Sequence, residues 1–303
     1  MVLLDVSGLG SAFISGIIIG SLYALMAMGL ALIYSTVRVL NFAHGSFFMM
    51  GAFIAWWLIF PNLGSTQTTS GLQLPFTPAF IISITIIFGL GLVTQRFLIR
   101  PLIRRPDSLF TTLIVTLSLA TILEAFATLV FGGYRQEFPD IATGKFQSSG
   151  LTITFSQLIE FGVAIAVLIL TQVFLKRTRY GLGMRAVAQD MDAATLCGIS
   201  INRIYLIAFG IGALLAAIAG ILLAGTFFVS PTMGQAPLTI AFIIVVFGGI
   251  GSITGTIAAS FIIAFVQSYM SLIFDPNWAL TIAFGLMVFV LIVRPQGLFG
   301  FKE

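Results

Sequence analysis

The sequence predicts an all-α, polytopic membrane protein with about nine transmembrane segments. Only 8% of its 303 residues are charged, whereas roughly 25% are charged in ordinary soluble domains. Hydrophobic residues make up 59% of the chain, and the mean hydropathy is +1.12. Apolar runs close to the roughly 20 residues that a spanning helix needs recur along the whole chain. This composition excludes a soluble enzyme, a secreted domain and a disordered chain, so we treat residues 1–303 as a single transmembrane domain.

Nine apolar runs define the expected helices. Small residues spaced four apart, at Gly16 and Gly20 in the first run and at Ala216 and Gly220 in the sixth, predict close helix packing. The second run is short and opens on polar residues, and the seventh ends in the glycine-rich stretch 247–255. We therefore expect one or two segments to be broken or re-entrant. In chain order the runs cover residues 11–34, 42–60, 79–97, 109–131, 157–175, 204–228, 237–253, 255–273 and 278–293.

The basic residues predict how these segments are oriented. With nine spans, 12 of the 14 Lys and Arg residues fall in loops on one side of the membrane, and only Arg135 and Lys145 fall on the other. Cytoplasmic loops are enriched in Lys and Arg, so we expect the N-terminus outside and the C-terminus in the cytoplasm. The four arginines between residues 96 and 105 also fit contact with anionic membrane lipid.

Several chemistries are excluded by what the chain lacks. It has one cysteine, Cys197, and one histidine, His44, so neither an internal disulfide nor a His-pair metal site is expected. The phosphate-binding pattern G-x-x-x-x-G-K-[ST] does not occur, so we expect no ATPase site, no cofactor and no metal in this chain. The G-x-S-x-G pattern of a serine hydrolase is also missing. The basic residues lie in short loops between apolar runs, which argues against a nucleic-acid partner.

The loop 176–203 carries a helical pattern of its own. Good helix formers follow Gly183 without a proline, and Asp190 and Asp192 precede a short apolar run that ends near Gly198. We predict a short amphipathic helix in this cytoplasmic loop. Two interpretations stay open, because such a helix can lie solvated at the membrane interface or dock into a groove of a soluble partner.

Three motifs resemble a known family. Asp192-Ala193-Ala194-x-x-x-Gly198 is similar to the E-A-A-x-x-x-G loop of ABC importer permeases, with Asp in place of Glu. Asn41-Phe42-Ala43-His44-Gly45 and the C-terminal Arg294-Pro295-Gln296-Gly297-Leu298-Phe299-Gly300 resemble the H-type permease of branched-chain amino acid ABC importers. The matches lie in both halves and at both ends, so the resemblance covers essentially the whole chain.

This resemblance implies a subunit that translocates branched-chain or other hydrophobic amino acids by alternating access across a bacterial inner membrane. It implies three kinds of partner: a second, M-type permease, two cytoplasmic ATPases that bind ATP and Mg, and a periplasmic or lipoprotein substrate-binding protein. The loop 176–203 would be the coupling segment that seats in the ATPase. The residues implied in that coupling are Asp190, Asp192, Ala193, Ala194 and Gly198.

Polar residues and glycines inside the spans are candidates for the translocation path or its gate. Asn41 and His44 are three positions apart and would share a helix face near the cytoplasmic end, where a helix cap or a buried hydrogen bond is the competing interpretation. Glu124 lies within a span, where an ionisable group is costly. It is expected to bond Ser118 or Thr121 on its own segment, or a neighbouring helix. Glycines of the 247–255 stretch complete the set: Gly248, Gly249 and Gly251.

Two alternatives to the amino-acid importer remain open from the sequence. A permease for urea or short amides is a close variant within the same family and shares the Asn-x-Ala-His-Gly pattern. An ion-coupled secondary transporter would use Glu124 as the coupling group but would leave the Asp192–Gly198 motif unexplained. The sequence does not specify which amino acid or amide is carried, or whether the pore is a homodimer or a heterodimer.

Overall fold

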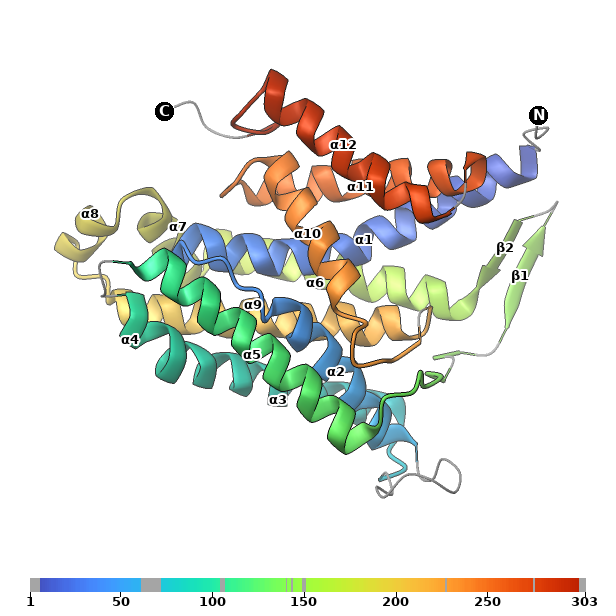
Figure 1. The fold of residues 1–303 in the computed structure, drawn as a ribbon, viewed down its shortest axis with the longest axis horizontal. Coiled ribbons are helices and arrows are strands. Elements are labelled where there is room, and N and C mark those ends of the chain that lie inside the picture. Colours follow the sequence, from blue (N-terminus) through green and yellow to red (C-terminus); the bar gives the residue numbers. More distant parts are fainter. Residues whose placement is uncertain are drawn as a thin grey trace.

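The computed structural model describes residues 6–60, 72–103, 107–139, 141–142, 144–148, 151–226, 228–274 and 276–299. It is a bundle of helices with one small hairpin at one end (Figure 1). The first half contains α1 (Val6–Val37), α2 (His44–Ile59), α3 (Phe76–Val93), the π-helical turn η1 (Thr94–Ile99), α4 (Arg100–Ile103) and α5 (Ser108–Phe131). The second half contains β1 (Lys145–Ser148), β2 (Leu151–Thr154), α6 (Phe155–Arg177), α7 (Arg179–Gln189), α8 (Met191–Leu196), α9 (Ile201–Ala224), α10 (Gln235–Gly248), α11 (Ile253–Ile273) and α12 (Pro276–Val293).

Each of the nine apolar runs coincides with a helix, which confirms the mainly helical prediction. Six of the helices in the described residues are long and apolar enough to cross a bilayer, beginning with α1 and ending with α11. Three others, α2, α10 and the apolar part of α12, are apolar but shorter. The chain is therefore a multi-pass helical membrane protein. The antiparallel β1–β2 hairpin in the loop between α5 and α6 was not predicted.

Two helices form the centre of the bundle. Most of α1 and α9 is buried, whereas α3, α5, α6 and α11 expose most of their length. Glycines let the central helices approach closely, since a Cβ on Gly29 of α1 would lie 2.8 Å from the carbonyl oxygen of Gly212 on α9. Gly16 and Gly20 pack in the same way against Phe265 and Phe261 of α11. The outer helices turn large apolar side chains such as Leu129 outward, as lipid contact requires.

A substitution on α9 tests this packing. A Cβ on Gly220 would lie 2.8 Å from the carbonyl carbon of Phe48 on α2. Because the obstacle is backbone, Gly220→Ala is expected to lower the free energy of unfolding by about 1–3 kcal/mol. Gly162→Ala on α6 is the control, since nothing lies within 4 Å of its added methyl. Thermal unfolding of both variants in detergent measures the difference, and equal midpoints would contradict the close contact.

The second helix begins deep inside the bundle. After α1 ends, the chain reverses at Arg38, whose φ is 56°, and returns alongside the bundle to His44. The His44 Nε2 atom lies 3.0 Å from the carbonyl oxygen of Met26. Met26 precedes the end of α1 at Val37 by 11 residues, which corresponds to about 16 Å along the helix axis. The first turn of α2 therefore lies near the middle of the bundle.

The start of α10 meets the start of α2. A Cβ on Gly45 would lie 2.6 Å from the carbonyl oxygen of Gly234, and the reverse contact is closer still. From this point α2 runs toward the hairpin end of the bundle, and α10 runs toward the end that carries α7 and α8 (Figure 1). Both helices are shorter than the roughly 20 residues that a full span needs. Irregular backbone of this kind is tolerated inside a membrane protein only where other protein groups or a cavity satisfy it.

Candidate functional site

The loop predicted to couple to a motor is a pair of short helices at one end of the bundle (Figure 1). The chain turns sharply from α6 into α7 at Thr178, whose Oγ1 accepts a hydrogen bond from the backbone N–H of Gly181 at 3.1 Å. Gly181 is required there, because a Cβ would lie 2.5 Å from the Cα of Leu175. The turn directs α7 and α8 away from the line of α6.

The helix α8 is bounded by two of the predicted residues. The Oδ1 atom of Asp190 accepts hydrogen bonds from the backbone N–H groups of Asp192 and Ala193, both at 2.9 Å, so Asp190 caps the helix. Gly198 ends it with a φ of 80°, a conformation that favours glycine. The backbone N–H of Ile199 donates to the carbonyl of Ala194 at 3.1 Å. The short helix predicted to end near Gly198 is thus present.

Most of α8 is available to a partner. Ala194 is 3% exposed and faces the protein, whereas Asp192, Ala193 and Met191 are exposed. Leu196 is 90% exposed, which is unusual for a large apolar side chain beside exposed charged residues such as Asp190 and Asp192. The structure therefore brings the five predicted coupling residues together, and it adds Leu196 at the tip. Its position after Ala193 and Ala194 was visible in the sequence, but its exposure was not.

The structure corrects the interpretation of Asn41 and His44. Asn41 precedes the helix, so the two residues do not share a helix face. His44 does not lie near an end of the bundle, since it pairs with Met26 in the middle of α1. The residue before α2 is Ala43, and no side chain caps the helix, so the predicted cap is wrong. The predicted buried hydrogen bond is present at His44. The side-chain amide of Asn41 is buried and has no hydrogen-bond partner among the described residues.

A residue that the sequence analysis missed stabilises this break. Thr116 of α5 accepts a hydrogen bond from the backbone N–H of Phe42 at 3.3 Å, and its hydroxyl lies 3.3 Å from the carbonyl oxygen of Leu40. The hydroxyl thus satisfies backbone groups of a non-helical segment that water cannot reach easily. Ser46 adds a contact of 3.4 Å to the carbonyl oxygen of Ala120 on the same helix. A threonine within an apolar run was the only sequence signal.

Glu124 bonds a neighbouring helix. Its two carboxylate oxygens accept from Nε2 of Gln235 at 3.2 and 3.4 Å, which joins α5 to the first residue of α10. The predicted partners are wrong, because Ser118 and Thr121 donate to carbonyls of their own helix, those of Ile114 and Leu117. Gln235 was not singled out from the sequence. The pair is not buried: Gln235 is exposed and Glu124 is half-buried.

A second acidic residue within a span, Glu160 on α6, is buried. It is 1% exposed. Thr226, just beyond the end of α9, donates to its Oε2 at 3.4 Å. Burial of a carboxylate in a spanning helix requires such partners. The sequence pattern located the helix end correctly but did not show that the end of α9 covers it.

The glycine-rich stretch 247–255 forms a tight turn between α10 and α11. A Cβ on Gly248 would lie 2.6 Å from the carbonyl oxygen of Gly255, so α10 and α11 touch through their backbones. Gly249 and Gly251 have φ values of 102° and 91° and form the turn. The C-terminal segment closes over it, since Leu298 donates its backbone N–H to the carbonyl of Phe247 at 2.9 Å. The C-terminal motif is thus packed against this turn.

The arrangement suits transport. Among the described residues, no three His, Cys, Asp or Glu side chains gather in a way that could hold a metal ion. The helices α2 and α10 begin side by side inside the bundle. The pair of Glu124 and Gln235 joins α5 to α10, and the exposed helix α8 lies at one end. Interrupted helices that meet near the midplane are a feature of membrane transport proteins, which is the class that the fold and the site define.

Comparison with protein families gives the family within that class. Residues 12–291 match the model described as the permease component of branched-chain amino acid transport systems, and the chain belongs to this family. It is 31% identical over 296 residues to the high-affinity branched-chain amino acid transport system permease protein BraD of Pseudomonas aeruginosa, covering 96% of this chain and 95% of that protein.

Two further relatives are similar over almost their whole length. The corresponding permease protein LivH of Escherichia coli is 29% identical over 296 residues, which covers 95% of this chain and 94% of LivH. A probable branched-chain amino acid transport permease protein of Methanocaldococcus jannaschii is 27% identical over 317 residues, covering 99% and 96% of the two chains. The family resemblance found in the sequence motifs is therefore confirmed.

Proposed function

We propose that this chain is the transmembrane permease subunit of an ATP-driven importer, and that it translocates branched-chain amino acids by alternating access. The observation that carries the proposal is the exposed helix α8, which presents Leu196 and Asp192 at its surface, where a soluble partner can bind them. The names of the relatives support the substrate class. An apolar path also suits aliphatic side chains, although urea and short amides are the variant within the family that a substrate panel must test.

The proposed orientation places α7 and α8 in the cytoplasm of a bacterial inner membrane. Basic side chains concentrate at that end, among them Lys176, Arg177, Arg179, Arg185 and Arg203. Lys145 belongs to the hairpin at the opposite end of the bundle. The positive-inside rule then puts the hairpin and the N-terminus outside. The three short helices α2, α10 and α12 are proposed to complete nine membrane segments, with α2 and α10 as half-spans.

We place the translocation path along the face shared by α5 and α10. Glu124 and Gln235 lie on it, and the first turn of α10 adds backbone N–H groups that carry no side-chain cap. A carboxylate and a helix N-terminus are complementary to the ammonium and carboxylate of an amino acid. Asn41 and His44 are fully buried, so we propose that they hold the break between α1 and α2 rather than contact substrate.

The remaining machinery is proposed to come from partners. Two ATPases would bind ATP and Mg and receive α8, a second M-type permease would face α5 and α10, and a substrate-binding protein would dock at the hairpin end. Closure of the ATPases would draw two copies of the coupling segment together and switch access between the two sides. This chain would carry force through α7 and α8 and would hydrolyse nothing itself.

Reconstitution tests the proposal directly. Proteoliposomes with the permease pair, the ATPases and the binding protein are expected to take up leucine, isoleucine or valine only when ATP is supplied. Urea and acetamide are expected to be left outside. Uptake that persists without any ATPase, and that is lost when a proton or sodium gradient is dissipated, would overturn the proposal. It would instead favour the ion-coupled transporter, for which the half-buried Glu124 is the specific structural argument.

A further inference from the structure

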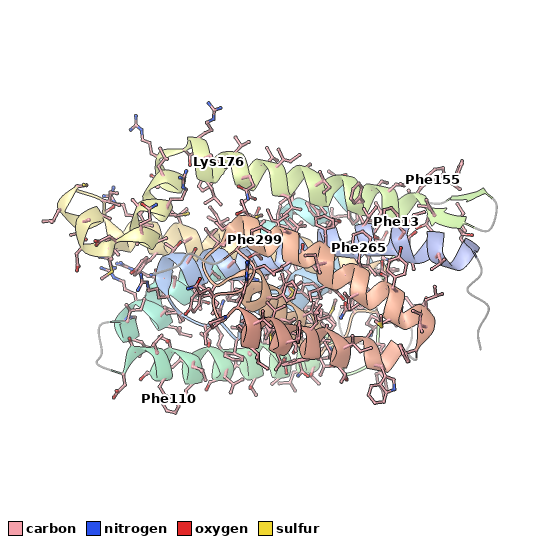
Figure 2. All side chains as sticks on the ribbon, turned by 90° about the horizontal axis from the view of Figure 1, so that it is seen from above. Phe13, Phe110, Phe155, Lys176, Phe265 and Phe299 are labelled. Atoms are coloured by element: carbon pink, nitrogen blue, oxygen red, sulfur yellow. The ribbon has the colours of Figure 1, made fainter. Side chains whose placement is uncertain are left out.

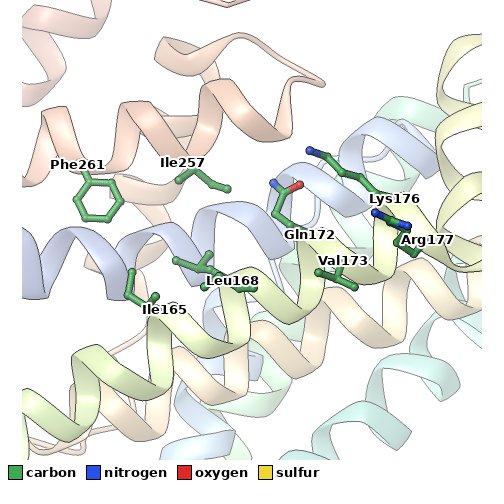
Figure 3. A pocket seen from close by; sticks show the side chains of 9 residues that line it. Ile165, Leu168, Gln172, Val173, Lys176, Arg177, Ile257 and Phe261 are labelled. Carbon is green, nitrogen blue, oxygen red and sulfur yellow. The ribbon is translucent and has the colours of Figure 1, made fainter.

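An open groove of about 450 Å³ lies between α6 and α11 on the outside of the bundle. Its α6 wall is a single helix face, because the lining residues recur three or four positions apart from Ile165 to Lys176. Ile257 and Phe261 of α11 form the opposite wall. α1 packs against both helices, whereas α6 and α11 do not pack closely against each other, so α1 lies at the floor (Figure 3).

The groove is apolar along most of its length and basic at one end. Ile169 on α6 is 57% exposed and lines the groove together with Ile257 and Phe261. Lys176 and Arg177 line the end at which α6 gives way to α7. Figure 2 shows that Lys176 lies on the outer surface of the bundle, well away from the face that carries α5 and Phe110. The groove is therefore separate from the proposed translocation path.

A buried amide without a partner lies between the basic and apolar parts. The Nε2 atom of Gln172 is inaccessible to solvent and has no hydrogen-bond partner among the described residues. Its side chain points from α6 toward the α11 side of the groove (Figure 3). An unpaired buried donor is costly, so a rotation of the Gln172 side chain that brings Nε2 to an acceptor in the groove would be stabilising.

We propose that this groove binds one anionic phospholipid of the membrane leaflet at the α7 end. Its phosphate lies between Lys176 and Arg177, an ester carbonyl accepts from Nε2 of Gln172 once that side chain rotates into the groove, and an acyl chain lies along Ile169, Ile257 and Phe261. The order of groups along α6 matches the order in the lipid. Lys176 and Gln172 are four residues apart, about 6 Å along the axis, and the apolar wall continues for about 10 Å from Gln172 to Ile165.

Charge decides between lipid classes. Paired basic side chains at a membrane interface attract anionic headgroups, whereas the ammonium of a zwitterionic headgroup gains nothing from them. The apolar half of the groove alone would accept either lipid. A preference for the anionic lipid is therefore the property that identifies the site, and it does not depend on the proposed transport function.

Native mass spectrometry of the full-length purified chain tests the site. The detergent-solubilised protein is titrated with phosphatidylglycerol or phosphatidylcholine of the same acyl chains. The double variant Lys176→Gln/Arg177→Gln is expected to bind phosphatidylglycerol on the order of 30-fold more weakly, since each basic residue contributes roughly fivefold. The matched control is Arg179→Gln/Arg203→Gln, which removes two exposed charges at the same end that do not line the groove.

A second variant tests the apolar half and keeps the test independent of the charges. Ile257→Trp fills the groove and is expected to reduce binding of both lipids without changing the oligomeric state. The proposal is overturned if wild-type protein binds both lipids equally, or if the charge-removing variant and its control lose phosphatidylglycerol to the same extent. It is also overturned if Ile257→Trp breaks up a protein oligomer while lipid binding is unchanged, because the occupant would then be a protein segment.

Discussion

Replacing Leu196 by aspartate is expected to abolish the association of this permease with its ATPase and to reduce transport by more than 100-fold. Leu196 is 90% exposed at the tip of α8, so the change has no packing cost within the chain. In a docked complex the same side chain would be buried. A lost leucine contact is worth about 1.5–3 kcal/mol, and an unpaired carboxylate placed in an apolar groove adds several more. The measurement is co-purification of the ATPase with the tagged permease, followed by ATP-dependent uptake.

The control is another exposed leucine at the opposite end of the protein. Leu72 is 58% exposed in the segment just before α3, so Leu72→Asp adds the same charge away from α8. It is expected to leave the ATPase bound. If Leu196→Asp retains both the ATPase and wild-type uptake, then α8 is a solvated helix and the coupling role assigned to Asp192, Ala193 and Gly198 fails with it.

Replacing Glu124 by glutamine is expected to reduce amino-acid uptake by about 10- to 150-fold while the complex still assembles. The variant keeps the size of the side chain and can keep a hydrogen bond to Gln235, which lies 3.2 Å away. It removes the negative charge, and a hydrogen bond to a charged group is worth about 1.5–3 kcal/mol. The loss should therefore be seen in uptake and in binding-protein-dependent ATPase stimulation, and not in thermal stability.

Ser118→Ala on the same helix serves as the control for Glu124. The Ser118 hydroxyl donates to the carbonyl of Ile114 within α5 at 2.9 Å, so its removal should leave uptake unchanged. Wild-type uptake by Glu124→Gln would show that the pair only joins α5 to α10. A fall in unfolding midpoint that accounts for the lost uptake would point to the same structural role.

Some properties of the chain can be predicted from composition and periodicity because they are local. A run of about 20 apolar residues forms a helix in lipid whatever its neighbours are, since its backbone must satisfy its own hydrogen bonds. All nine runs are helical for that reason. The helix α8 was predictable from an equally local argument, because Asp190 directly precedes it and caps its first turn, and Gly198 follows its end.

The candidate site was predictable only in its residue types. Glu124 was recognised as costly within a span, but its partner Gln235 is 111 positions away, and no periodicity connects the two. Asn41 and His44 were recognised as polar, yet they were placed at the wrong depth. The cause is the reversal at Arg38, which carries the chain back along α1 and is held by Thr116 of another helix.

The amino-acid sequence alone was enough to predict that this protein lies in a membrane, where its helices are and to which family it belongs. The scarcity of charged residues excludes water as the medium for most of the protein surface. The family motifs are contiguous in the sequence, so they can be recognised without knowing how the helices pack. The starting points of α2 and α10, the pairing of polar side chains and the burial of others became known only from the tertiary structure. These depend on contacts between helices distant in the chain, where one glycine such as Gly45 or Gly234 permits an approach that no local pattern encodes.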